Sequence, residues 1–169
     1  MVSAASWGLW LYLGAQRLWE LSRARANERA MRAQGGVEHA AGHYPAMFAF
    51  HAVFFAVLAA ALSRGARLGP RSGPWLALFA AAQLLRFWSV ASLGPAWSTR
   101  IWTVPGRVPV RSGPYRFLRH PIYCAVIAEI AAVPMSFGLA GAAVALSVAN
   151  AAILAVRVRA EDRALRAAC

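Results

Sequence analysis

The sequence predicts an all-α integral membrane protein with about five transmembrane helices, and three observations lead to this fold class. Hydrophobic residues make up 60% of the 169 positions and the mean hydropathy is +0.48, more apolar than an ordinary soluble domain. The chain divides into five apolar runs, each close to the roughly 17–25 residues that a helix needs to cross hydrocarbon. The cationic residues, 18 Arg and no Lys, gather between these runs. A single membrane-embedded domain over residues 1–169 is therefore expected.

The apolar runs set the order of the elements. They lie at residues 2–21, 45–63, 74–93, 121–137 and 139–157. The first three form a group of N-terminal helices within residues 1–93, with a polar loop expected over residues 22–44. Only uncharged residues separate the last two runs, from Pro134 to Gly141, which predicts a tight helical hairpin. Residues 94–169 thus comprise a connector, the hairpin and a polar tail.

The distribution of Arg predicts the orientation in the membrane. Thirteen Arg lie in residues 22–44, 94–120 and 157–166, whereas three lie in the loop around residue 67. Because cytoplasmic loops carry the excess of positive charge, the N-terminus is expected outside and the connector and tail in the cytoplasm. The net charge of +12 also raises the possibility of nucleic-acid binding. We expect no nucleic-acid partner, since the Arg residues fall between apolar runs rather than on one soluble face.

Two polar pairs are expected near or inside the apolar runs. Arg17 and Glu20 are three residues apart, so they share a helix face and can form an ion pair. Arg86 and Glu129 each lie roughly 12 Å from the predicted cytoplasmic helix ends, at ~1.5 Å per residue, which predicts a buried pair between the third and fourth helices. Spacing alone leaves open whether this second pair fixes helix register or contributes to a site.

Common cofactor motifs are absent from the sequence. Neither G-x-G-x-x-G nor G-x-x-x-x-G-K occurs, so neither standard nucleotide cradle is expected. His39 and His43 are four residues apart in a Gly-rich stretch, but no third ligand accompanies them. We therefore predict no metal site.

The segment around His120 indicates a site for a small charged molecule. The preceding residues are rich in Pro and Gly and predict an ordered, extended connector with free backbone groups. His120 stands before Pro121, which suits the first turn of a helix, so His120 is expected to cap a helix N-terminus that favours a carboxylate. Arg157 and Glu161 are spaced i, i+4 in the tail and share a face, either as a site or as a solvated ion pair.

These residues resemble a known family of membrane enzymes. The pattern Gly113-Pro114-Tyr115, Arg119-His120-Pro121-x-Tyr123 and, after the hairpin, Arg157 and Glu161-Asp162-x-x-Leu165 is similar to the isoprenylcysteine carboxyl methyltransferase (ICMT) superfamily. Related phospholipid methyltransferases share a similar C-terminal half. Further motifs resemble a bacterial branch of small membrane methyltransferases: Asn27-Glu28, Gly35-Gly36-x-Glu38, His43-Tyr44-Pro45, Arg86-Phe87-Trp88, Ser92-Leu93-Gly94-x-x-Trp97 and Val104-Pro105-Gly106.

The resemblance implies a methyltransferase that uses S-adenosylmethionine in a cytoplasmic cofactor pocket. Matched motif by motif, the residues implied to bind this cofactor are Arg107, Val108, Pro109, Val110, Tyr115, Arg119, His120, Pro121, Tyr123 and Glu161. Arg157 is implied to face the acceptor, and Arg86 and Glu129 are the further candidates for the catalytic set. The acceptor is expected to be a lipophilic small molecule from the membrane lipid, resembling an isoprenylcysteine carboxylate or an alkylpyrone, whose acid or enol oxygen receives the methyl group.

Three other functions remain open at this stage. One is N-methylation of an aminolipid head group, although a nearby Arg does not favour the neutral amine that this reaction needs. Another is a nicotinamide-dependent reductase, since Arg-His-Pro-x-Tyr also occurs in membrane sterol reductases. The third is a non-catalytic membrane scaffold. Binding of labelled S-adenosylmethionine separates either methyltransferase from the last two.

Overall fold

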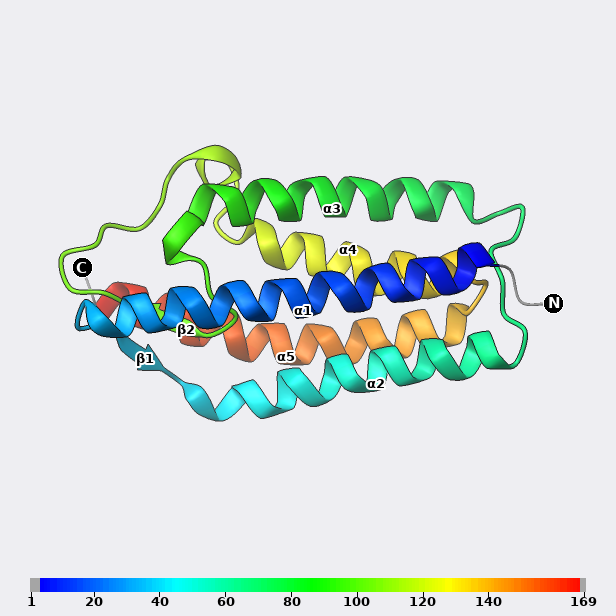
Figure 1. The fold of residues 1–169 in the computed structure, drawn as a ribbon, viewed down its shortest axis with the longest axis horizontal. Coiled ribbons are helices and arrows are strands. Elements are labelled where there is room, and N and C mark those ends of the chain that lie inside the picture. Colours follow the sequence, from blue (N-terminus) through cyan, green and yellow to red (C-terminus); the bar gives the residue numbers. More distant parts are fainter. Residues whose placement is uncertain (1–3, 168–169) are drawn as a thin grey trace.

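The computed structural model describes residues 4–167 and shows five α-helices within them, running side by side along one axis (Figure 1). The helices are α1 (Ala4–Ala33), α2 (Tyr44–Ser63), α3 (Gly73–Leu93), α4 (Pro121–Ser136) and α5 (Ala140–Ala167). A two-stranded ribbon pairs β1 (Val37–His39) with β2 (Ile101–Thr103). Single 3₁₀ turns are η1 (Ala41–His43), η2 (Gly94–Ala96) and η3 (Gly113–Arg116). The ribbon and the connector lie at the end of the bundle opposite the N-terminus (Figure 1).

The prediction of five transmembrane spans is only partly supported. Three helical segments are long and apolar enough to cross a membrane, Tyr44–Ser63, Gly73–Ala96 and Ala140–Ala167, and they suggest an integral membrane protein. Helix α4 is apolar but has only 16 residues, fewer than the ~20 that a perpendicular span needs. Helix α1 is long enough, but Arg17 and Glu20 interrupt its apolar half. Length and composition therefore support three spans.

The loop expected over residues 22–44 is helical for its first half, which corrects the sequence prediction. Helix α1 continues to Ala33 because Ala, Arg, Glu and Met all favour helix. It ends where Gly35 adopts a φ of 76° and the Gly36 N–H donates to the Met31 carbonyl at 2.9 Å. This geometry is a Schellman cap, which favours glycine at the left-handed position. The helix thus carries its Arg residues well past the apolar half.

The ribbon corrects the expectation of a purely all-α fold, so the chain is mostly helical rather than entirely so. Within the connector, Ile101 pairs with His39 and Thr103 with Val37 in antiparallel register. The pairing is fastened by the Arg100–Glu38 ion pair at 2.5 Å and by a 2.7 Å hydrogen bond between the side chains of His39 and Thr103. Ile101 is buried against Ala160 and Ala164 of α5, so the ribbon holds the connector against the helix ends.

The predicted C-terminal hairpin is confirmed. Helices α4 and α5 are joined by a short turn, Phe137–Leu139, in which Gly138 has a φ of 73°. Helix α5 then runs through the expected polar tail without a break as far as Ala167. Arg157 and Glu161, the two residues that the sequence singled out in the tail, therefore lie on the same helix that forms the hairpin.

The apolar core occupies the half of the bundle away from the ribbon. It is built from aliphatic and aromatic side chains of all five helices, among them Leu13, Phe54, Phe79, Ile130 and Leu146. Toward the other end of the bundle, the turn η3 packs closely on α3. There Gly113 has a φ of 56°, and a Cβ at this position would approach the Ser92 Oγ to 2.1 Å. Only glycine allows this turn to reach α3.

Candidate active site

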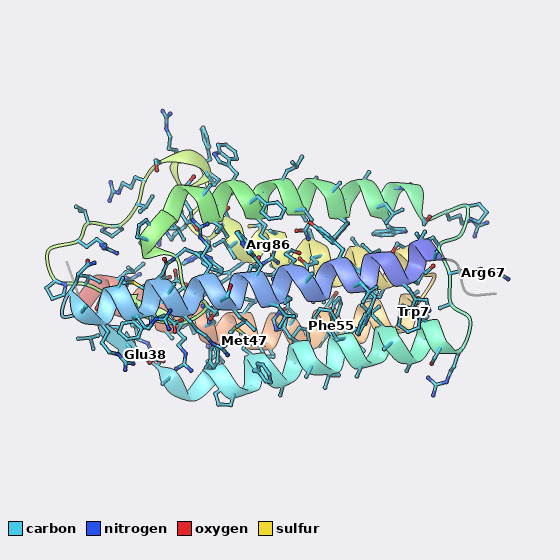
Figure 2. All side chains as sticks on the ribbon, viewed as in Figure 1. Trp7, Glu38, Met47, Phe55, Arg67 and Arg86 are labelled. Atoms are coloured by element: carbon cyan, nitrogen blue, oxygen red, sulfur yellow. The ribbon has the colours of Figure 1, made fainter. Side chains whose placement is uncertain are left out.

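A cavity of about 1050 Å³ lies in the half of the bundle nearer the ribbon. Residues of all five helices and of the connector between α3 and α4 line it. Figure 2 shows two of the lining residues, Met47 on α2 and Arg86 on α3, in that half, whereas Trp7 and Arg67 lie toward the opposite end. The volume is at the upper end of the ~300–1,000 Å³ that is typical of small-molecule sites.

One wall of the cavity is a cluster of polar side chains from α4 and α5. The Tyr123 hydroxyl donates a hydrogen bond to Glu161 and accepts one from the Nε of Arg157 at 2.8 Å. The His120 ring stacks on the Tyr123 ring, with centroids 5.3 Å apart and planes inclined by 16°. His120 Nε2 also lies 3.2 Å from Asp162. The hairpin thus brings together residues that are about 40 positions apart in the sequence.

Arg157 is the most deeply placed cation of this cluster. Its side chain is 94% buried and its guanidinium lies 5.7 Å from the centre of the Tyr123 ring. A second nitrogen approaches the Met47 sulfur on α2 at 3.3 Å. Since these contacts hold the guanidinium from α4 and from α2, Arg157 presents a positioned positive charge inside the cavity rather than a solvated one.

The connector forms a second wall. Arg107 donates a 2.9 Å hydrogen bond to Gln34, just after the end of α1, and the residues that follow Arg107 border the cavity without regular secondary structure. Burial, and next the negative charge of Glu161, raise the pKa of Tyr115, so its hydroxyl remains protonated. The indole N–H of Trp102 is buried and has no acceptor among residues 4–167. Other atoms of Trp102 line the cavity.

A buried ionic network closes the inner end of the cavity. Arg86 contacts Glu129 at 2.8 Å and Glu20 at 3.5 Å, and Arg17 contacts Glu20 at 2.5 Å and also pairs with Glu129. Gln83 donates a further hydrogen bond to Glu129 at 3.1 Å. Both predicted pairs are therefore confirmed, but as one network spanning α1, α3 and α4. The charges of its two Arg and two Glu residues sum to zero.

Arginine dominates the charge of the cavity as a whole. Of the described residues that line it, nine are Arg and three are carboxylates, Glu20, Glu161 and Asp162. The mouth is the most positive part because the connector contributes Arg107, Arg111, Arg116 and Arg119. Such a field attracts anions.

The structure brings together most of the residues that the sequence singled out. Those that line the cavity are Arg86, Arg107, Val108, Pro109, Val110, Tyr115, Arg119, His120, Tyr123, Arg157 and Glu161. Pro121 is buried in the first turn of α4 and shapes the backbone beneath His120 instead. Glu129 lies behind the two Arg residues that it pairs with and is not among the lining side chains.

Sequence reasoning missed other lining residues, and two of them had a recognisable signal. His51 and Asn150 are polar side chains inside apolar runs, and such residues usually face the interior of a bundle. Asp162 was part of a recognised motif but was not assigned to the site. Met47 and Trp102 carry no signal in a single sequence, because their position depends on how α2 and the ribbon pack.

Comparisons with known proteins agree with this geometry. The family model described as the isoprenylcysteine carboxyl methyltransferase (ICMT) family matches residues 75–167, which include the connector, the hairpin and the cluster around Tyr123. An uncharacterized protein of Bacillus subtilis (strain 168), YpbQ, is 37% identical over 163 residues, covering 95% of this chain and 96% of that protein. No solved structure matches. The chain therefore belongs to the ICMT family, and this membership suggests a methyltransferase that depends on S-adenosylmethionine.

Proposed function

We propose that this protein O-methylates a lipophilic acid or enol at the membrane, with S-adenosylmethionine as the methyl donor. Acceptors of this class resemble an isoprenylcysteine carboxylate or an alkylpyrone. The arrangement that supports the proposal best is the Tyr123 hydroxyl, which links Glu161 to Arg157 at the wall of the cavity. One hydroxyl thereby couples a carboxylate suited to the donor with a guanidinium suited to the acceptor.

The residues of the cavity fit the polar groups of S-adenosylmethionine. Glu161 and Asp162 are carboxylates that can accept hydrogen bonds from the ammonium group of the donor. The N-terminus of α4, which begins directly after His120, carries partial positive charge and suits the carboxylate. An ammonium and a carboxylate thus each find a partner.

Arg157 is the residue that we assign to the acceptor. It is buried, remains charged in a low-dielectric setting and approaches α2 through Met47. S-adenosylmethionine supplies the methyl group when bound. The chain aligns the acceptor oxygen with it and excludes water, and these are the main requirements of an in-line displacement. An acceptor whose oxygen is already ionised needs no general base.

The charge of the cavity favours O-methylation over N-methylation. Nine Arg against three carboxylates attract an anionic acid or enolate and repel an ammonium head group. The cavity also lies where a lipophilic acceptor can reach it, at the end of helices that are apolar enough to span a membrane. We propose that this end faces the cytoplasm, since most Arg residues gather there.

The experiment has two arms on the purified protein. Labelled S-adenosylmethionine should bind, which separates a methyltransferase from a reductase or a scaffold. Methyl transfer is then compared between a long-chain 4-hydroxy-2-pyrone, a fatty acid and a long-chain amine. Transfer to the pyrone or the acid, with little to the amine, supports the proposal. Transfer mainly to the amine contradicts it, and absence of donor binding rejects a methyltransferase function altogether.

A further inference from the structure

The inner end of the cavity contains polar atoms that the protein itself leaves without partners. Asn150 of α5 is 97% buried and borders the cavity, yet its amide has no hydrogen-bond partner among the residues that the structure describes. Burying an unsatisfied amide costs free energy. An apolar side chain at this position would cost less free energy on folding, unless a molecule in the cavity contacts the amide.

His51 of α2 presents a second available atom at the same end. Its Nδ1 donates to the Met47 carbonyl at 2.9 Å. In the neutral ring this bond leaves Nε2 as a hydrogen-bond acceptor, and within residues 4–167 no partner contacts it. His51 borders the cavity and lies close enough to Arg17 and Glu129 to interact with their charges.

Arg86 lines the same end through other atoms. The residue is 97% buried, its terminal nitrogens bind Glu20 and Glu129, and its Nε–H is itself buried and has no acceptor in the described part of the chain. The atoms that the cavity offers a ligand are therefore the ring acceptor of His51 on α2 and the amide of Asn150 on α5, which border a single space.

The charge and depth of this end indicate what kind of group fits it. The network behind it holds two cations and two anions, so no net charge attracts an ion. Asn150 precedes Arg157 by seven residues on α5, which places it about 10 Å deeper at ~1.5 Å per residue. A neutral group that both donates and accepts hydrogen bonds suits these atoms, at a distance from Arg157 that a small ring can bridge.

We propose that this inner end, formed by His51 and Asn150, binds a neutral hydroxyl group on the head of the methyl acceptor. The hydroxyl donates to His51 Nε2 and accepts from the Asn150 amide. The acceptor thus carries two oxygen functions, one beside Arg157 that receives the methyl group and a second that anchors the molecule. This inference rests on the proposed function only for the identity of the ligand as an acceptor.

A matched pair of ligands tests the site without the methyl donor. 5-Pentadecylresorcinol and 3-pentadecylphenol share one alkyl chain and differ by one hydroxyl group, so their partition into lipid is similar. Binding of both is measured by calorimetry to the protein in nanodiscs. The wild type should bind the resorcinol about tenfold more tightly, and Asn150→Leu should reduce the ratio to less than about twofold. Val148→Leu, an exposed position on the same helix, should leave the ratio unchanged.

The ratio of the resorcinol affinity to the phenol affinity tests the proposal, because the contribution of the shared alkyl chain cancels in it. An equal ratio in the wild type and in Asn150→Leu overturns the proposal and indicates that water alone occupies the inner end. His51→Phe provides a second test at a residue on another helix, and it should reduce the ratio as well. Binding of S-adenosylmethionine is measured separately. Its absence rejects the proposed function, whereas the ligand ratio still reports on the inner site.

Discussion

Replacing Tyr123 by Phe isolates one hydroxyl on which the candidate site depends. The substitution keeps the ring that stacks on His120 at 5.3 Å and removes only the oxygen. That oxygen donates to Glu161 and accepts from Arg157 at 2.8 Å. We therefore expect the variant to fold, while Glu161 loses the contact that holds it toward the cavity.

The magnitude follows from the charges of the two partners. A hydrogen bond to a charged group contributes about 1.5–3 kcal/mol, and the two bonds of one hydroxyl are not additive. Glu161 is 30% exposed in its side chain, so water replaces part of the loss there, whereas Arg157 is only 6% exposed and does not recover fully. With ~1.4 kcal/mol per tenfold change, the affinity for S-adenosylmethionine should fall about ten- to a hundredfold.

Isothermal calorimetry with S-adenosylmethionine measures this effect directly. Tyr12→Phe is the matched control, since Tyr12 is 43% exposed on α1 and packs edge-on against Phe79, away from the cavity. An unchanged affinity in a folded Tyr123→Phe protein refutes the reasoning, because the link between Glu161 and Arg157 would then serve structure alone. An equal loss in the control would point to a general effect on stability.

Four further predictions address the acceptor, the network, the topology and the pH response. Arg157→Ala should retain binding of S-adenosylmethionine but lose most methyl transfer to a lipophilic enol. Arg157→Lys should recover only part of the transfer, because lysine lacks the planar guanidinium. Calorimetry measures the binding, and turnover with the enol measures the transfer. Glu129→Gln should lower the free energy of unfolding by about 3–5 kcal/mol in a denaturation assay, since it leaves two buried Arg residues without their shared anion. In a cysteine-free background, Ser112→Cys should be accessible from the cytoplasm and Arg71→Cys from outside, as both positions are exposed; labelling on the same side contradicts the topology. Because burial raises the pKa of Tyr115, ionisation above about pH 10 favours the unfolded state, so stability should fall there, and Tyr115→Phe should flatten this fall in a melting profile.

Local patterns predicted the features that depend on composition and spacing. The apolar runs located all five helices, and the uncharged stretch near Pro134 predicted the hairpin. Helical spacing predicted that Arg17 and Glu20 would pair, and depth in the membrane predicted that Arg86 would meet Glu129. These inferences succeeded because each rests on the period of one helix or on the cost of isolating a charge in an apolar setting.

Other features required the packing of distant segments and could not be derived from one sequence. The ribbon joins residues 37–39 to 101–103, and its pairing depends on where α1 ends and on the path of the chain after α3. Short strands of three residues carry too little periodicity to be recognised. Three of the five predicted spans have the length and composition to cross a membrane, and apolar length in the sequence alone does not show that α4 ends after 16 residues.

The sequence by itself determined the helical membrane character of this protein, its asymmetry of charge and the chemical types gathered around His120 and Arg157. Composition and periodicity suffice for these properties because hydrocarbon excludes charge and requires internally bonded helices. Only the tertiary structure decided that Tyr123 joins Arg157 to Glu161, that two ion pairs form one network, and that His51 and Asn150 border the same cavity. Such contacts depend on the rotation of each helix about its axis, which the close packing of all five helices fixes together.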